Sequence, residues 1–181
     1  MTEKLKYAII GAGCMGQEHI LNIEIIDDAE VIALCDTSEK SIKESLDLLN
    51  NDVAIFDNYI DLVEANIADA FIIATPNFTH IEVLKEVMKS EAHLLIEKPL
   101  CTTVKDCQEF EKLAVDYPGV IWTAMEYRYM PPVQRMIKEI HNKTIGDLKM
   151  LSIREHRFPF LHKVDDWNRF SIKTGGTLVE K

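Results

Sequence analysis

The chain has 181 residues, of which 47% are hydrophobic, and its formal net charge is −10. This composition supplies enough apolar surface for a packed core and so excludes a disordered chain. The acidic balance disfavours non-specific binding to nucleic acid or to anionic membranes, and no apolar run has the length of a membrane span or the form of a secretory signal. We therefore expect a cytoplasmic globular protein.

Short apolar strands alternate with amphipathic helices over roughly the first two thirds of the chain. Strands are predicted at residues 6–10, 30–35, 54–56, 70–74, 93–96 and 120–124. Helices are predicted at residues 15–26, 38–49 and 58–64, from Thr79 with Glu82 completing a capping box, and at 103–117. This alternation predicts an α/β fold with a doubly wound parallel sheet of the Rossmann type.

The pattern changes near residues 124–130. A helix is predicted to begin at Pro131, and a long strand is predicted over about residues 148–156. Irregular sequence follows as far as Gly176. We therefore expect one domain over residues 1–125 and the beginning of a second, incomplete domain over residues 126–181.

A glycine-rich turn follows the first predicted strand and opens a helix. Gly11 permits a tight turn, Gly13 lets the backbone approach a pyrophosphate, and Gly16 lets the helix pack closely on the strand. The helix N-terminus would then face the phosphates. The alternative is a glycine turn without a ligand. The cofactor-binding candidates here are Gly11, Ala12, Gly13, Cys14, Met15 and Gly16.

Asp36 ends the second predicted strand, about twenty residues after the glycine turn, where an acidic residue binds the hydroxyls of the adenine ribose. Its charge would repel a 2′-phosphate, and Thr37 and Ser38 follow it rather than an arginine. We therefore expect NAD as cofactor, with NADP as the alternative. Asp36 could also serve as a helix N-cap, and the two roles are compatible.

Two further runs end predicted strands, where ligands bind in open α/β sheets. The first supplies Thr75, Pro76, Asn77 and His80 as cofactor-binding candidates, with a local hydrogen bond as the alternative role of the histidine. The second supplies Glu97 and Lys98, followed by Pro99, which could introduce a cis bond. A lysine at this position could bind a substrate oxygen or act as an acid or base.

The glycine turn, Asp36 and these two runs together resemble the Gfo/Idh/MocA oxidoreductases. Residues 125–131 and 175–180 match the same family. The resemblance implies hydride transfer between NAD(P) and a hydroxyl-bearing carbon of a sugar, cyclitol or related polyol. It also implies a C-terminal α/β domain with a mostly antiparallel sheet, assembly into dimers or tetramers, and a catalytic role for Lys98.

Two positions depart from the family pattern. Glu180 stands where the family has an aspartate that a histidine follows four residues later, and the sequence stops at Lys181. We therefore expect a fragment of a longer protein that is aggregation-prone and inactive by itself, with Glu180 as a second catalytic candidate. Glu126 replaces a residue that is neutral in many members. Nearby, Arg128 is a cofactor-binding candidate that could also contact a substrate or brace the domain boundary.

Other functions remain open at this point. A dinucleotide-binding sensor or assembly subunit would keep the glycine turn without catalysis, and an NAD-assisted glycosidase of the same family would cleave sugars without net oxidation. The 4 cysteines and 6 histidines show no zinc-ligand spacing, so we expect no metal site.

Overall fold

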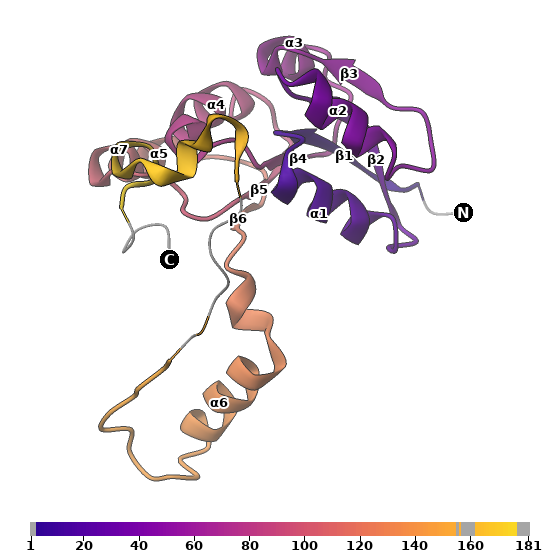
Figure 1. The fold of residues 1–181 in the computed structure, drawn as a ribbon. Helices are drawn as coiled ribbons and strands as arrows, with labels where there is room; N and C mark the ends of the chain where they lie inside the picture. Colours follow the sequence, from indigo (N-terminus) through magenta and orange to yellow (C-terminus); the bar gives the residue numbers. More distant parts are fainter. Residues whose placement is uncertain (1–2, 155, 157–161, 177–181) are drawn as a thin grey trace. The chain divides into compact units, whose positions relative to one another are not determined.

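The computed structural model describes residues 3–154, 156 and 162–176. The chain divides into two compact units (Figure 1). One unit holds the residues up to Ala124 together with those from Asp165 onward, and the other holds Met125–Val164. The residues from Asp165 onward thus group with the first unit, whereas the sequence assigned them to the second; the domain boundary itself stays a prediction.

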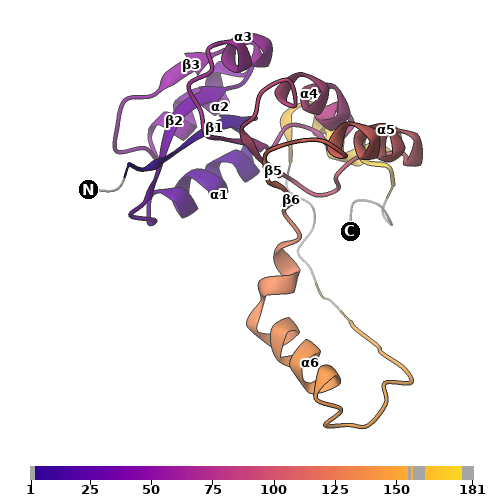
Figure 2. The same cartoon turned by 180° about the vertical axis from the view of Figure 1, so that it is seen from behind.

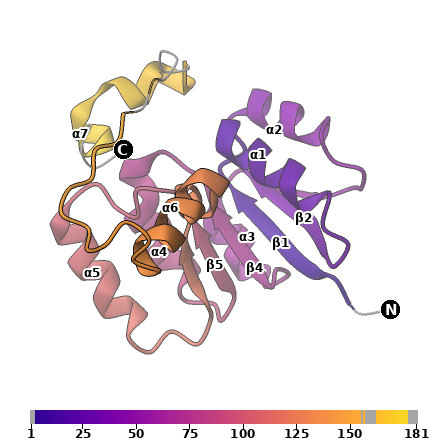
Figure 3. The same ribbon diagram turned by 90° about the horizontal axis from the view of Figure 1, so that it is seen from below.

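The first unit is built on a six-stranded parallel sheet. Its strands are β1 (Leu5–Ile10), β2 (Ala29–Cys35), β3 (Ala54–Phe56), β4 (Ala70–Ile73), β5 (His93–Ile96) and β6 (Ile121–Thr123). The order across the sheet is β3-β2-β1-β4-β5-β6, and every neighbouring pair is parallel. Figure 3 shows β2, β1, β4 and β5 in this order. This order is that of a doubly wound sheet, as predicted, and it reverses between β1 and β4.

Helices cover both faces of the sheet (Figures 1 and 2). They are α1 (Cys14–Ile23), α2 (Glu39–Leu46), α3 (Tyr59–Glu64), α4 (His80–Val87) and α5 (Val104–Ala114). The side-chain oxygens of Ser38, Asn58 and Thr103 cap α2, α3 and α5 by accepting hydrogen bonds from backbone N–H groups of the first turn.

The core lies on both sides of the strands. Ile10 on β1 and Phe71 on β4 face the cluster that contains helices α3 to α5, whereas Ile9 and Ile72 face the cluster that contains α1. All four side chains are at most 1% exposed. Burial on both faces explains why these strands read as unbroken apolar runs rather than as alternating ones.

The capping box predicted at Thr79 is not formed. The backbone N–H of Thr79 donates to the carbonyl of Pro76, and Glu82 pairs with Lys85 instead. A 3-10 turn, η1 (Asn77–Thr79), precedes α4 and takes up the residues that the sequence assigned to the cap.

The second unit contains a 3-10 turn, η2 (Glu126–Tyr129), and the helix α6 (Pro131–His141), which begins at the predicted proline. The strand predicted over residues 148–156 is absent from residues 148–154 and 156, which are irregular. A β-strand needs a hydrogen-bonded neighbour, and the described residues offer it none in this unit. The chain then forms η3 (Val164–Arg169) and the short helix α7 (Ser171–Thr174).

Replacing Gly16 by alanine should destabilise the first unit, because a Cβ there would lie 2.1 Å from the carbonyl oxygen of Gly11. The shifts that accommodate such an overpacked methyl group lower the free energy of unfolding by about 1–3 kcal/mol or more. Urea unfolding followed by circular dichroism measures the change. Gly13→Ala is the matched control, since a Cβ at Gly13 would meet no atom of the described residues within 4 Å. Equal unfolding free energies for the two variants would contradict the prediction.

Candidate dinucleotide-binding site

The glycine-rich turn meets the turn after β4 where the strand order reverses. Gly11 has a φ of +98°, and a Cβ at this position would lie 2.6 Å from the carbonyl carbon of Ala74. Glycine is therefore required both by the backbone conformation and by the close approach. The carboxyl edge of the sheet at such a reversal is where open α/β folds bind ligands.

The start of α1 has the form of an anion site. Its N-cap is Gly13, which offers no side-chain oxygen to the free N–H groups of the first turn. Space beside Gly13 is open among the described residues, so a phosphate could approach the backbone closely. Cys14 and Met15, the next two candidates, are both exposed.

The Asp36 carboxylate fastens the glycine turn to the end of β2. Its Oδ2 accepts from the N–H of Ala12 at 2.7 Å, and its Oδ1 accepts from the N–H of Ser38 at 2.8 Å. Ser38 rather than Asp36 caps α2, so the N-cap role considered for Asp36 is wrong. The carbonyl of Ala12 accepts from the buried hydroxyl of Ser45 at 3.0 Å, which holds the turn from a third direction.

The turn after β4 contains a buried donor without an acceptor. Asn77 is 7% exposed, and its Nδ2 has no hydrogen-bond partner among the described residues. Thr75 and Pro76, which precede it, are half-buried. Because a buried amide without a partner is costly, Asn77 fits a site that a ligand group completes.

His80 is fully buried and joins two turns. Its Nδ1 lies 3.0 Å from the carbonyl oxygen of Pro99 and 3.3 Å from that of Leu100, and its Nε2 lies 3.0 Å from that of Thr75. The imidazole is 0% exposed, so it has no face open to a cofactor. The local hydrogen bond, considered as its alternative role, is what the structure contains, and direct cofactor contact does not fit.

The lysine turn follows β5 at the same edge. Glu97 is 6% exposed, and its Oε2 accepts from the N–H of Lys98 at 3.2 Å. The Lys98–Pro99 peptide bond is cis. The ammonium of Lys98 has no hydrogen-bond or ion-pair partner among the described residues, which leaves it available to a ligand.

His19 also belongs to this edge, although the sequence analysis assigned it no role. Its Nε2 lies 2.7 Å from Oε1 of Glu97. The available signal was spacing: His19 comes three residues after Gly16, on the helix face that packs toward the sheet.

The other two predicted site residues are not part of the described first unit. Arg128 belongs to the second unit, and Glu180 lies outside the described residues. Among the residues that are described, no cluster of three or more histidine, cysteine or acidic side chains could hold a metal ion. Burial raises the pKa of the Cys35 and Cys101 thiols to about 12, so both are unreactive at neutral pH.

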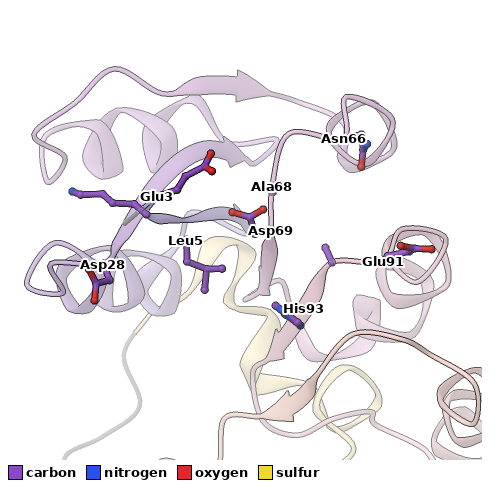
Figure 4. A pocket seen from close by; sticks show the side chains of 10 residues that line it. Glu3, Leu5, Asp28, Asn66, Ala68, Asp69, Glu91 and His93 are labelled. Atoms are coloured by element: carbon purple, nitrogen blue, oxygen red, sulfur yellow. The ribbon is translucent and has the colours of Figure 1, made fainter. Parts of the chain in front are cut away.

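A hollow of about 580 Å³ lies at the opposite edge of the sheet, where the strands begin (Figure 4). Its lining includes the acidic residues Glu3, Asp28, Asp69 and Glu91. Carboxylates in this number repel phosphates, so this hollow does not suit a dinucleotide. The carboxyl edge therefore remains the candidate site.

The sheet order, the glycine turn and the acid after β2 define a nucleotide-binding Rossmann protein. Residues 5–125 match the model of the oxidoreductase family with an NAD-binding Rossmann fold, named GFO_IDH_MocA. The chain belongs to this family, as its resemblance predicted. No helix among the described residues is long and apolar enough to cross a membrane.

Two relatives in sequence match this chain over only part of their own length. The rhizopine catabolism protein MocA of Rhizobium meliloti is 25% identical over 98% of this chain and 53% of its own. The myo-inositol 2-dehydrogenase of Thermotoga maritima is 26% identical over 82% of this chain and 44% of its own. The chain thus spans about half the length of these relatives.

A solved structure supports the fold. The scyllo-inositol dehydrogenase of Lactobacillus casei, solved with NAD(H) and scyllo-inositol, superposes with a TM-score of 0.74 at 19% identity, over 80% of this chain and 43% of its own. At this identity the likeness establishes the Rossmann fold and leaves the substrate of this chain to other arguments.

Acidification should destabilise the chain through His80. Burial lowers the pKa of His80 below its ordinary value of 6.5, although the three carbonyls and the charge of Glu97 act in the opposite direction. Just below pH 6.5 the unfolded chain then binds more protons than the folded one. The contribution of His80 to the free energy of unfolding is therefore fully present above that pH and is lost as the pH decreases.

Urea unfolding between pH 7.5 and 5.5 measures this slope, which for one group is at most about 1.4 kcal/mol per pH unit. His80→Gln should flatten it, because the variant has no imidazole to protonate at this position. A stability that rises on acidification in the wild type and not in His80→Gln would instead show a folded imidazolium that donates to carbonyls from both nitrogens.

Proposed function

We propose that the complete protein is an NAD-dependent dehydrogenase that transfers a hydride between the cofactor and a hydroxyl-bearing carbon of a sugar, cyclitol or related polyol. The observation that carries this proposal is that the glycine turn, Asp36 and an unpaired Lys98 lie at the same edge of the sheet. Titration of the chain with NADH, followed by nicotinamide fluorescence, tests the cofactor site directly. Absence of saturable binding by a folded chain would overturn it.

The first turn of α1 would bind the pyrophosphate through its free N–H groups. The Asp36 carboxylate already accepts from two backbone N–H groups, and its remaining acceptor capacity would bind the adenine ribose hydroxyls. The unpaired Nδ2 of Asn77 would donate to a cofactor oxygen. NAD, when bound, supplies the hydride acceptor or donor.

Lys98 would stabilise the substrate oxygen. An ammonium beside a hydroxyl that loses its proton stabilises the developing alkoxide and orients the carbon that carries it. Glu97, Arg128 and Glu180 are further candidates for cofactor binding or catalysis.

The substrate class rests on the relatives and neighbours named as inositol dehydrogenases. Because the chain spans about half the length of these relatives, a second domain would contribute the substrate pocket and the contacts of a dimer or tetramer. Its beginning would be residues 126–181, and the chain alone would then be inactive.

Cofactor preference should change when the carboxylate at residue 36 is replaced. In Asp36→Ser/Thr37→Arg, the charge that repels a 2′-phosphate is lost and a guanidinium that binds it is gained. The ratio of the NADH and NADPH dissociation constants should shift toward NADPH by at least about tenfold, or about 1.4 kcal/mol. Asp36→Asn is the control: it removes the charge and one of the two acceptor oxygens but adds no guanidinium. An unchanged ratio in the double variant would refute the role of Asp36.

Loss of the Lys98 ammonium should reduce turnover without affecting cofactor binding. With NAD and myo-inositol as the trial substrate, Lys98→Ala in the full-length protein should lower kcat by at least about a hundredfold. NADH affinity should stay within about twofold, because backbone groups and Asp36 carry it. Lys105→Ala, at an exposed lysine of α5, is the control. Turnover of Lys98→Ala within a few-fold of wild type would exclude this role.

A further inference from the structure

The His19–Glu97 contact joins the helix of the glycine turn to the lysine turn. His19 lies on α1, and Glu97 directly precedes Lys98. The side chains are 16% and 8% exposed, and their hydrogen-bonding atoms are 2.7 Å apart. Shielding from water strengthens such a bond and makes its loss more consequential.

Glu97 connects His19 to the backbone of Lys98 through its two carboxylate oxygens. One carboxylate oxygen accepts from the ring N–H of His19, and the other accepts from the N–H of Lys98 at 3.2 Å. The N–H of Glu97 itself donates to the carbonyl of Ile73 and so extends the ladder between β4 and β5. Each oxygen of this buried carboxylate therefore has a partner, as a buried charge requires.

We propose that His19 is a positioning residue for the catalytic lysine: by holding Glu97, it fixes the backbone from which Lys98 reaches the reacting oxygen. This proposal rests on the proposed dehydrogenase function. The Lys98 ammonium has no partner of its own among the described residues, so its direction depends on the backbone beneath it. A lysine whose ammonium is displaced by about 1 Å from its productive position loses much of its catalytic effect.

The lysine turn has a second brace on its other side. His80 holds the carbonyls of Pro99 and Leu100, which follow Lys98. Loss of the His19 bond therefore frees one side of the turn while the other stays attached. We expect variants of His19 to fold, with greater motion confined to the residues around Lys98.

Two substitutions separate positioning from simple packing. His19→Phe keeps an aromatic ring of similar size and removes the donor. His19→Gln removes the ring and keeps an N–H donor at a similar reach. If His19 acts by positioning, the glutamine variant resembles the wild type and the phenylalanine variant does not; if it only fills space, the order is reversed.

The first measurement is amide hydrogen exchange at Lys98 by NMR, without cofactor. In His19→Phe the Lys98 amide should exchange about fivefold faster, as expected for loss of one hydrogen bond, and in His19→Gln within about twofold of wild type. The control His93→Phe, at the opposite edge of the sheet, should leave the rate unchanged. Wild-type exchange in His19→Phe, or equal acceleration in His19→Gln, would overturn the proposal.

The second measurement is reductive methylation of the Lys98 amine at saturating NADH, quantified by mass spectrometry. NADH should shield Lys98 in the wild type and in His19→Gln, and it should shield Lys98 less in His19→Phe. Equal shielding in all three proteins would also overturn the proposal.

Failure of the proposed function has a separate signature. If NADH neither binds nor shields Lys98 in the wild type, the dehydrogenase assignment fails, and amide exchange alone then decides whether His19 holds the turn. If His19→Phe does not fold, His19→Asn replaces it, because its shorter amide does not reach Glu97 and its volume is smaller.

Discussion

The close contact between Gly16 and the carbonyl oxygen of Gly11 is the constraint on which the site depends. It lets α1 begin directly against β1, so that the N-terminus of the helix points along the carboxyl edge of the sheet. Gly11 in turn lies against the backbone of Ala74, which brings the turn after β4 to the same place. A side chain at either glycine would separate elements that the ligand must contact together.

Two carboxylates then organise the edge through backbone groups. Asp36 binds the N–H groups of Ala12 and Ser38, and Glu97 binds the N–H of Lys98 and the ring of His19. Both connect segments that are distant in the sequence, and both accept hydrogen bonds from backbone N–H groups, so they fix the main chain of the turns. A backbone held in this way needs little reorganisation when a ligand arrives, which is the usual condition for tight and oriented binding.

The sequence predicted the parts of this structure that depend on local patterns. Apolar strands, the glycine turn and the acid after β2 each have a signal within a few residues, and the structure contains all of them. The capping box at Thr79 failed because the 3-10 turn at Asn77 uses the same backbone groups. The strand near residues 148–156 failed because strands form in pairs, and pairing is not a property of one segment.

The contacts of the histidines were beyond prediction for the same reason. His19 and His80 meet partners 78 and about 20 residues away, and only the packed sheet brings them together. The sequence marked His80 as a candidate without its partners, and it gave no role to His19 or to His93, which lies at the other edge. Sequence spacing finds a turn that binds a ligand directly, but it does not find the side chains that hold such a turn in place.

The charges of the chain are distributed so that an anion can bind an acidic protein. At the carboxyl edge, the oxygens of Asp36 and Glu97 are occupied by N–H donors, while the free N–H groups of α1 and the unpaired Lys98 present positive potential. At the amino edge, the acidic side chains around the hollow of Figure 4 give the opposite sign. A chain of net charge −10 thus has one edge suited to phosphates. All strands of the parallel sheet end at this edge, so the turns and the helix N-termini that follow them gather their N–H donors there, whatever the overall charge.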